Sequence, residues 1–192
     1  MIRSLYDWTL DKAEHPKALW ILAILSFTES SFFPIPPDIL LIPMVLAAQA
    51  RAWRIAFVCS IASVLGGIFG YFIGYALFDV IGQPIIDFYH MQDKFLWFQA
   101  KYNEWGAWIV SIAGFSPVPY KVVTIASGMT EMSLTTFIIA SALSRSARFF
   151  LVAFLLWKFG VPIRNFIEKR LGLLAAIFCI LLLGSFVALK YI

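Results

Sequence analysis

The sequence predicts an all-α integral membrane protein. The expected architecture is an inverted repeat of two re-entrant helical hairpins, each followed by a spanning helix, plus a C-terminal spanning helix. Three observations predict it. Hydrophobic residues make up 61% of the 192 residues, which is typical of membrane proteins rather than soluble ones. Two apolar stretches are each interrupted by a proline-rich motif, and basic residues cluster at the ends of the apolar runs.

The first proline-rich stretch is FTESSFFPIPPDILLIP, at residues 27–43. The apolar runs on either side, 18–27 and 39–48, are each too short to cross a bilayer, because a spanning helix needs about 20 residues. Prolines this dense remove backbone donors and prevent one continuous helix. The stretch therefore predicts a hairpin over residues 17–48 that enters the membrane and returns, broken at Pro34, Pro36 and Pro37.

A second stretch, FSPVPYK at residues 115–121, repeats the pattern and predicts a second hairpin over 107–130. One constant offset places its breaks, Pro117 and Pro119, opposite Pro34 and Pro36. The same offset places Lys121 opposite Asp38. A broken segment with an acid in one half and a base in the other predicts an inverted-repeat transporter whose site lies where the repeats meet.

The remaining segments fall around the two hairpins, and residues 17–160 are expected to form one transmembrane domain. A basic loop and C-terminal spanning helix follow, at 161–192. The other expected elements are an interfacial N-terminal helix at 1–16, spanning helices at 55–78 and 134–157, and an interfacial segment rich in aromatic residues at 79–106.

Three glycines at four-residue spacing lie in the first spanning helix. A stripe of small residues lets another helix backbone approach closely, so we expect Gly66, Gly70 and Gly74 to serve in packing. The two cysteines, Cys59 and Cys179, lie inside separate apolar runs and are expected to be free buried thiols.

The distribution of charge predicts the topology. With a cytoplasmic N-terminus and hairpins that return to the side they entered, nine basic residues lie inside and only Lys94, Lys101 and Lys190 outside. The two repeats then have opposite orientations and the C-terminus lies outside. The nine inside are Arg3, Lys12, Lys17, Arg51, Arg54, Lys158, Arg164, Lys169 and Arg170.

Five ionisable residues remain at membrane depth, where each costs ~2.5–3.5 kcal/mol at a helix centre, so they are expected to share one wet cavity. Two acids against three bases leave one surplus positive charge, which suits an anionic ligand, above all a phosphate. A carboxylate there can also carry a proton, for which Glu29 is the preferred candidate. The alternative is that the charges only pair with one another and fix the fold. The five are Glu29, Asp38, Lys121, Arg145 and Arg148.

Four motifs, taken together, resemble one family. They are E-S-S-F-F-P-I-P-P-D at 29–38, G-G-I-F-G-Y-F-I-G at 66–74, F-S-P-V-P-Y-K at 115–121 with A-S-G at 126–128, and S-R-S-A-R-F at 144–149. Over residues 17–160 the sequence resembles the DedA family of bacterial inner-membrane proteins. That family shares a domain with eukaryotic SNARE-associated and VTT-type lipid scramblases. The short chain is similar to the compact YqaA-like branch.

This resemblance implies two facing re-entrant hairpins and lipid translocation driven by the proton motive force, in support of envelope integrity. It also implies polyprenyl phosphate or phosphatidylethanolamine as substrate. The family's essential acids correspond to Glu29 and Asp38, and its arginines to Arg145 and Arg148. Many members carry an arginine near the second proline motif, where this chain has Lys121.

The leading hypothesis is therefore an inner-membrane lipid transporter or flippase for a lipid with a phosphate headgroup. The alternative is a proton- or cation-coupled antiporter of a small solute. An enzyme is not expected, because His15 and His90 lie outside the membrane core and no nucleophile–histidine arrangement is evident. The expected partners are membrane lipids and protons, with a homo-oligomer left open. No metal, cofactor or nucleic acid is expected.

Overall fold

The computed structural model describes residues 17–33, 35–116 and 119–160, and within them it contains helices and no strand. The all-α prediction is confirmed for this part of the chain. Two of its helices, Gln49–Phe88 and Leu134–Gly160, are long and apolar enough to cross a membrane. The predictions for 1–16 and 161–192, including Cys179, and for Pro34 and Pro117, lie outside the described residues.

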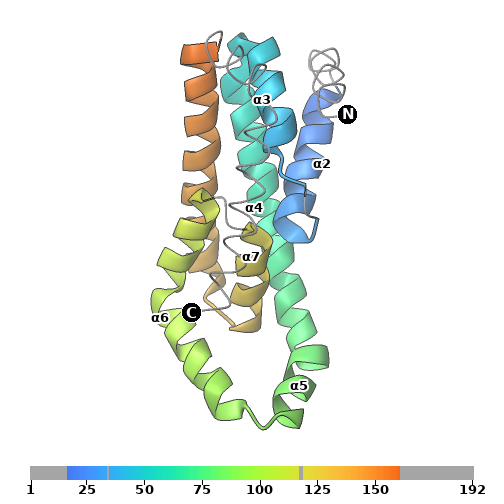
Figure 1. Ribbon diagram of the computed structural model, residues 1–192, viewed down its shortest axis with the longest axis vertical. Coiled ribbons are helices and arrows are strands. Elements are labelled where there is room, and N and C mark those ends of the chain that lie inside the picture. The colour runs from blue at the N-terminus through green and yellow to red at the C-terminus, as the bar shows by residue number, and fades with distance from the viewer. Residues whose placement is uncertain (1–16, 34, 117–118, 161–192) are drawn as a thin grey trace, which may run out of the picture.

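The first proline-rich stretch separates two short helices, α2 (Ala18–Ser31) and α3 (Asp38–Ala47). Pro37 precedes the first residue of α3, where its missing N–H costs nothing because that donor has no partner inside the helix. In Figure 1, α2 runs from the upper end of the molecule to its middle and α3 runs back. Both helices pack against α4 (Ala52–Leu77), which a 3-10 turn, Gln49–Arg51, connects to α3.

The region after α4 differs from the predicted single interfacial segment at 79–106. The helix continues through a π-helical turn, Phe78–Gly82, into α5 (Gln83–Phe88). A tight turn at His90 follows, and α6 (Gln92–Phe115) then runs without interruption past the predicted boundary at 106. Neither Gly106 nor its neighbours break α6, since a lone glycine weakens a helix without ending it. In Figure 1 this α5–α6 region extends as an arm below the other helices.

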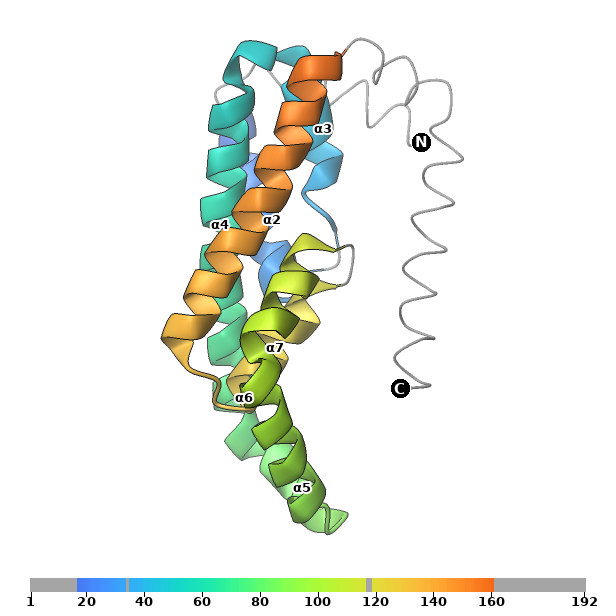
Figure 2. The same ribbon diagram turned by 90° about the vertical axis from the view of Figure 1, so that its left-hand side faces the viewer.

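The second proline-rich stretch ends α6 and precedes α7 (Tyr120–Met129). Figure 2 shows α6 rising to mid-height and α7 descending beside it, so that both breaks lie near the middle of the molecule. The chain then turns at Glu131 and returns to the upper end of the molecule in Leu134–Gly160. Each pair of helices joined by a proline break is thus followed by one long helix.

The three glycines of α4 hold the two halves against this helix. A Cβ at Gly66 would collide with the backbone carbonyl of Phe27 in α2, and one at Gly74 with that of Ile125 in α7. At Gly70 it would meet the hydroxyl of Thr124 in α7, and it would lie 3.2 Å from the carbonyl oxygen of Ser30 in α2. One stripe of small residues therefore carries both short helices, α2 at one end and α7 at the other.

Buried apolar side chains form two clusters, one in each half. The first cluster joins α2, α3, the start of α4 and the end of Leu134–Gly160, and includes Leu22, Leu41, Ile55 and Phe149. The second joins the end of α4, α6, α7 and the start of Leu134–Gly160, and includes Tyr71, Val110, Tyr120 and Phe137. Along both long helices the buried residues between these clusters are small or polar, and there the candidate site lies.

Candidate functional site

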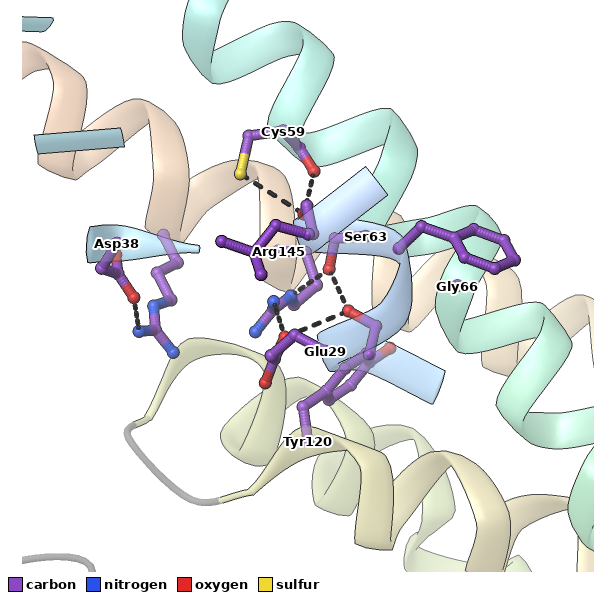
Figure 3. A network of polar contacts seen from close by, with 12 residues as sticks. Glu29, Asp38, Cys59, Ser63, Gly66, Tyr120 and Arg145 are labelled. Carbon is purple, nitrogen blue, oxygen red and sulfur yellow. Dashed lines mark hydrogen bonds and ion pairs between the residues drawn. The ribbon is translucent and has the colours of Figure 1, made fainter. Parts of the chain in front are cut away.

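The polar layer between the two apolar clusters receives side chains from the tips of both hairpins and from both long helices. Its buried polar members are Ser30, Ser31, Ser63, Thr124, Ser141, Ser144 and Arg145. Arg145 and Arg148 lie three residues apart on Leu134–Gly160 and so project from one side of that helix. Figure 3 shows Glu29 of the first hairpin beside Arg145, with Asp38 at one side of that pair.

Glu29, in the last turn of α2, forms an ion pair with Arg145. The distance from Arg145 Nη2 to Glu29 Oε2 is 2.9 Å, and the two side chains are 2% and 15% exposed. Arg145 Nε donates to Ser63 Oγ at 2.5 Å, and the Ser63 and Ser30 hydroxyls lie 2.7 Å apart. Ser30 Oγ in turn donates to Glu29 Oε2 at 3.3 Å. These four side chains therefore form a closed ring of hydrogen bonds, visible in Figure 3.

The closed ring determines which group each serine hydroxyl donates its proton to. A serine hydroxyl has one proton to donate. Since Ser30 donates to Glu29, Ser63 must donate to Ser30 while it accepts from Arg145. The guanidinium carbon of Arg145 also lies 4.8 Å from the Tyr120 ring centroid and 4.7 Å from that of Phe149. Arg145 is thereby held by a carboxylate, a hydroxyl and two aromatic rings, which compensates its burial.

Asp38, the first residue of α3, forms the second ion pair, with Arg148. Arg148 Nη2 lies 2.7 Å from Asp38 Oδ2, and the two side chains are 19% and 20% exposed. Arg148 Nη1 donates to the backbone carbonyl of Ser116, where α6 ends, at 3.0 Å. One guanidinium group therefore connects the first proline break to the second.

Lys121, the third base of the predicted set, lies in the first turn of α7 and is half-buried. Within the described residues its side chain has no ion pair or hydrogen bond. Both acids are thus each occupied by an arginine, and the surplus positive charge predicted from the sequence is carried by Lys121.

The structure thus brings together four of the five predicted ionisable residues as two ion pairs. It gives each acid an arginine partner, including Glu29, which the sequence analysis preferred as the proton carrier. The neutral groups of the layer, above all Ser30, Ser63 and Tyr120, were not predicted. Serines and tyrosines inside apolar runs are common in membrane helices, and only the fold shows that these face the arginines.

Two further side chains of α7 reach its neighbours. The Thr124 hydroxyl, which has one proton to donate, lies 2.9 Å from the Lys121 carbonyl oxygen of its own helix and 3.2 Å from the Ser30 carbonyl oxygen in α2. Tyr120 donates to Ser141 Oγ of Leu134–Gly160 at 2.5 Å. In the part of the chain that the structure describes, no three His, Cys, Asp or Glu side chains gather as a metal site would require. The chemistry available in this layer is therefore that of paired charges and hydroxyl groups.

Comparison with known proteins places the chain in a family. The model of the VTT domain matches residues 35–158. An uncharacterized protein of Haemophilus influenzae is 41% identical over 172 residues, which covers 86% of this chain and 88% of that protein. A similar protein of Histophilus somni is 42% identical over 172 residues, with the same coverage of both chains.

An archaeal relative, an uncharacterized protein of Methanocaldococcus jannaschii, is 27% identical over 125 residues, or 65% of this chain and 75% of its own. No solved structure gives a significant match. VTT-domain proteins are membrane proteins with a generally transporter-type, non-enzymatic role. The matched region includes both long helices and the second proline break, so the chain belongs to the VTT-domain family, the family of the DedA and SNARE-associated proteins.

Proposed function

We propose that this protein transports a lipid with a phosphate headgroup across the inner membrane of a bacterium, and that proton uptake at its carboxylates is coupled to the movement. The observation that carries the proposal is the charge balance of the polar layer. Two carboxylates are each held by an arginine, while Lys121 has no anionic partner among the described residues. An unpaired cation at membrane depth is costly unless water or an anion accompanies it.

The membrane arrangement that supports this function is an inverted repeat. The hairpins α2–α3 and α6–α7 enter from opposite leaflets, with the N-terminus cytoplasmic, and their proline breaks meet inside the bilayer. Support comes from the mid-height position of both breaks in Figure 2 and from the hydrogen bond that joins α7 to α2. Irregular backbone at that depth is tolerated where it lines a wet cavity. The arginines and hydroxyl groups of the layer between the apolar clusters are the polar side chains that would line it.

Within this arrangement the phosphate group enters the polar layer while its acyl or prenyl chains stay in the surrounding lipid. Lys121 provides a charge with no anionic partner among the described residues, and arginine provides a fork that binds phosphate through two oxygens. A proton taken up by Glu29 or Asp38 weakens that acid's hold on its arginine. Proton uptake by the acid whose arginine binds the headgroup thereby favours binding, and loss of that proton favours release.

The test is translocation by purified protein in proteoliposomes. Fluorescent phosphatidylethanolamine and polyprenyl phosphate are compared with a diacylglycerol that has the same label and chains but no phosphate. We expect protein-dependent translocation of the phosphate lipids alone, accelerated by an imposed proton gradient. Equal rates with and without protein, for every phosphate lipid, would contradict the proposal.

The second candidate is a coupled antiporter of a small solute, which would use the same acids without an opening for lipid. The same proteoliposomes distinguish the two functions. Uptake of a soluble cation driven by the pH gradient, with no lipid movement, would favour the antiporter. The matching control is the variant Lys101→Gln, which removes a charge from an exposed pair on α6 and is expected to behave as wild type.

A further inference from the structure

Each of the two ion pairs in the polar layer joins one carboxylate to one arginine, but the surroundings of the two pairs differ. Arg145 and Glu29 belong to the closed ring with Ser63 and Ser30, and the Arg145 side chain is 2% exposed. Among the residues that the structure describes, Arg148 and Asp38 belong to no such ring, and their side chains are 19% and 20% exposed. The difference assigns them different tasks.

Exchange of a partner is costly for Arg145. Its departure from Glu29 would break the ring, leave the Ser63 hydroxyl without its charged donor and abandon the two aromatic rings. A buried charge that loses its partner carries the full cost of desolvation. Arg145 is therefore a positioning residue that fixes α2 against α4 and the helix Leu134–Gly160.

Exchange is cheaper for Arg148. Its guanidinium is partly exposed, and the Phe149 ring is farther away, at 5.9 Å. Its hydrogen-bond partners among the described residues are one carboxylate oxygen and one backbone carbonyl. A phosphate presents the same kind of anionic oxygen as Asp38, in a geometry that the arginine fork matches. An incoming headgroup can therefore replace Asp38, and Arg148 then keeps one anionic partner throughout the exchange.

We propose that Arg148 is the arginine that exchanges its carboxylate for the phosphate group of the ligand, with Asp38 as the internal anion that occupies it when no ligand is bound. This inference rests on the proposed function and deepens it. Since Arg148 also holds the Ser116 carbonyl, the exchange releases the link between the two proline breaks. Headgroup binding is thereby coupled to separation of the hairpin tips.

The test compares Asp38→Asn with Glu29→Gln, two substitutions that each neutralise one carboxylate with almost no change in shape. Binding of short-chain phosphatidic acid to the full chain in detergent is measured by tryptophan fluorescence. Diacylglycerol of the same chain length is the control without phosphate. Inorganic phosphate, in a third series, shows whether the lipid part is needed, and weak competition by it is expected for a lipid site.

Removing the competing anion should tighten binding. We expect Asp38→Asn to bind phosphatidic acid about tenfold more tightly than wild type, within the range of ordinary coupling between two ligands. Glu29→Gln should give no tightening and a lower melting temperature. Arg148→Gln should abolish the gain in the Asp38→Asn background. Equal tightening by both neutralisations, or none by Asp38→Asn, would overturn the exchange.

A second measurement needs no variant and serves if Glu29→Gln fails to fold. Wild-type protein is treated with a membrane-permeant dicarbonyl reagent specific for arginine, and the modified residues are identified by mass spectrometry. Arg148 should react faster than Arg145, and phosphatidic acid should protect it. Equal or inverted reactivity would refute the assignment.

The two proposals fail in different ways. If wild type binds phosphatidic acid no better than diacylglycerol and moves no phosphate lipid, both the proposed function and the proposed exchange at Arg148 are wrong. If wild type binds and moves the lipid but the variants and the labelling fail to separate Arg148 from Arg145, only the exchange is wrong.

Discussion

The two helical pairs share a proline break but differ in the chemistry that they bring to the polar layer. The first pair, α2–α3, contributes two carboxylates, and both are bound by arginines of Leu134–Gly160. The second, α6–α7, contributes a backbone carbonyl to Arg148 and a lysine with no anionic partner in the described part of the chain. The two helix pairs therefore have similar backbone arrangements, but the first contributes acidic side chains and the second a basic one. The shared geometry brings the tips together, and the difference in charge is the basis of the proposal that the second tip accepts an anion.

The largest effect is expected where the first pair is anchored. Arg145→Met leaves Glu29 buried without its counter-ion and should lower the free energy of unfolding by about 3–5 kcal/mol. This loss is measured by unfolding the protein in detergent with increasing concentrations of denaturant. Adding Glu29→Gln removes the orphaned charge and should restore part of the loss. Arg148→Met, at the more exposed pair, should cost less. Equal losses for the two arginines would contradict the different roles assigned to them.

The next effect compares how the two pairs dock on α4. Gly66→Ala places a methyl group against the backbone of α2, and Gly74→Ala places one against that of α7. Each should lower the free energy of unfolding by about 1–3 kcal/mol, because backbone cannot move aside as a flexible side chain does. Gly82→Ala is the control, since its Cβ would meet only the Phe78 side chain. If Gly66→Ala were as stable as wild type, the backbone of α2 would not lie in contact with α4 at this position.

A smaller effect tests the charge of the second pair. Lys121→Gln removes the cation without an internal partner, so it should weaken phosphatidic acid binding about tenfold, as loss of one charge contact does. The melting temperature should stay near that of wild type, because no ion pair with a described residue is broken. Titration and thermal unfolding of one preparation give both values. A large loss of stability with unchanged binding would make Lys121 a structural residue.

The smallest effect is expected outside the layer. Lys101 and Glu104 form an ion pair of 2.8 Å on α6, with side chains 54% and 55% exposed. Lys101→Gln should change the free energy of unfolding by less than about 0.5 kcal/mol, since exposed pairs are screened by water. Thermal unfolding at low and high salt checks this value. If Lys101→Gln cost as much stability as Arg145→Met, burial would not explain the difference in strength between the ion pairs of this protein.

Much of the fold could be predicted because the proline motifs and apolar runs act locally. Prolines 36 and 37 end the first arm whatever surrounds them, so α2 and α3 lie within the predicted 17–48. The segment 79–106 was harder. Its alternating charges and aromatic side chains resemble an interfacial helix, but the helix ends depend on the π-helical turn at Phe78 and the left-handed residue His90. Neither has a distinct signal in the sequence.

For the site, the cost of charge at membrane depth identified the residue types but not their partners. The spacing of Arg145 and Arg148 predicts one helical face, whereas their pairing with Glu29 and Asp38 depends on contacts more than 100 residues apart in the chain. Ser63 could not be recognised at all. A serine gains a role there only because the Gly66 stripe brings α2 close enough for Ser30 to reach it.

The central claim is that the layer between the two apolar clusters carries a phosphate headgroup. The most direct measurement is the initial rate of translocation of fluorescent phosphatidylethanolamine in proteoliposomes that contain equal amounts of folded protein. We expect wild-type rates for Lys101→Gln and the rate of protein-free liposomes for the double variant Lys121→Gln and Arg148→Gln. Wild-type translocation by that double variant would contradict the claim.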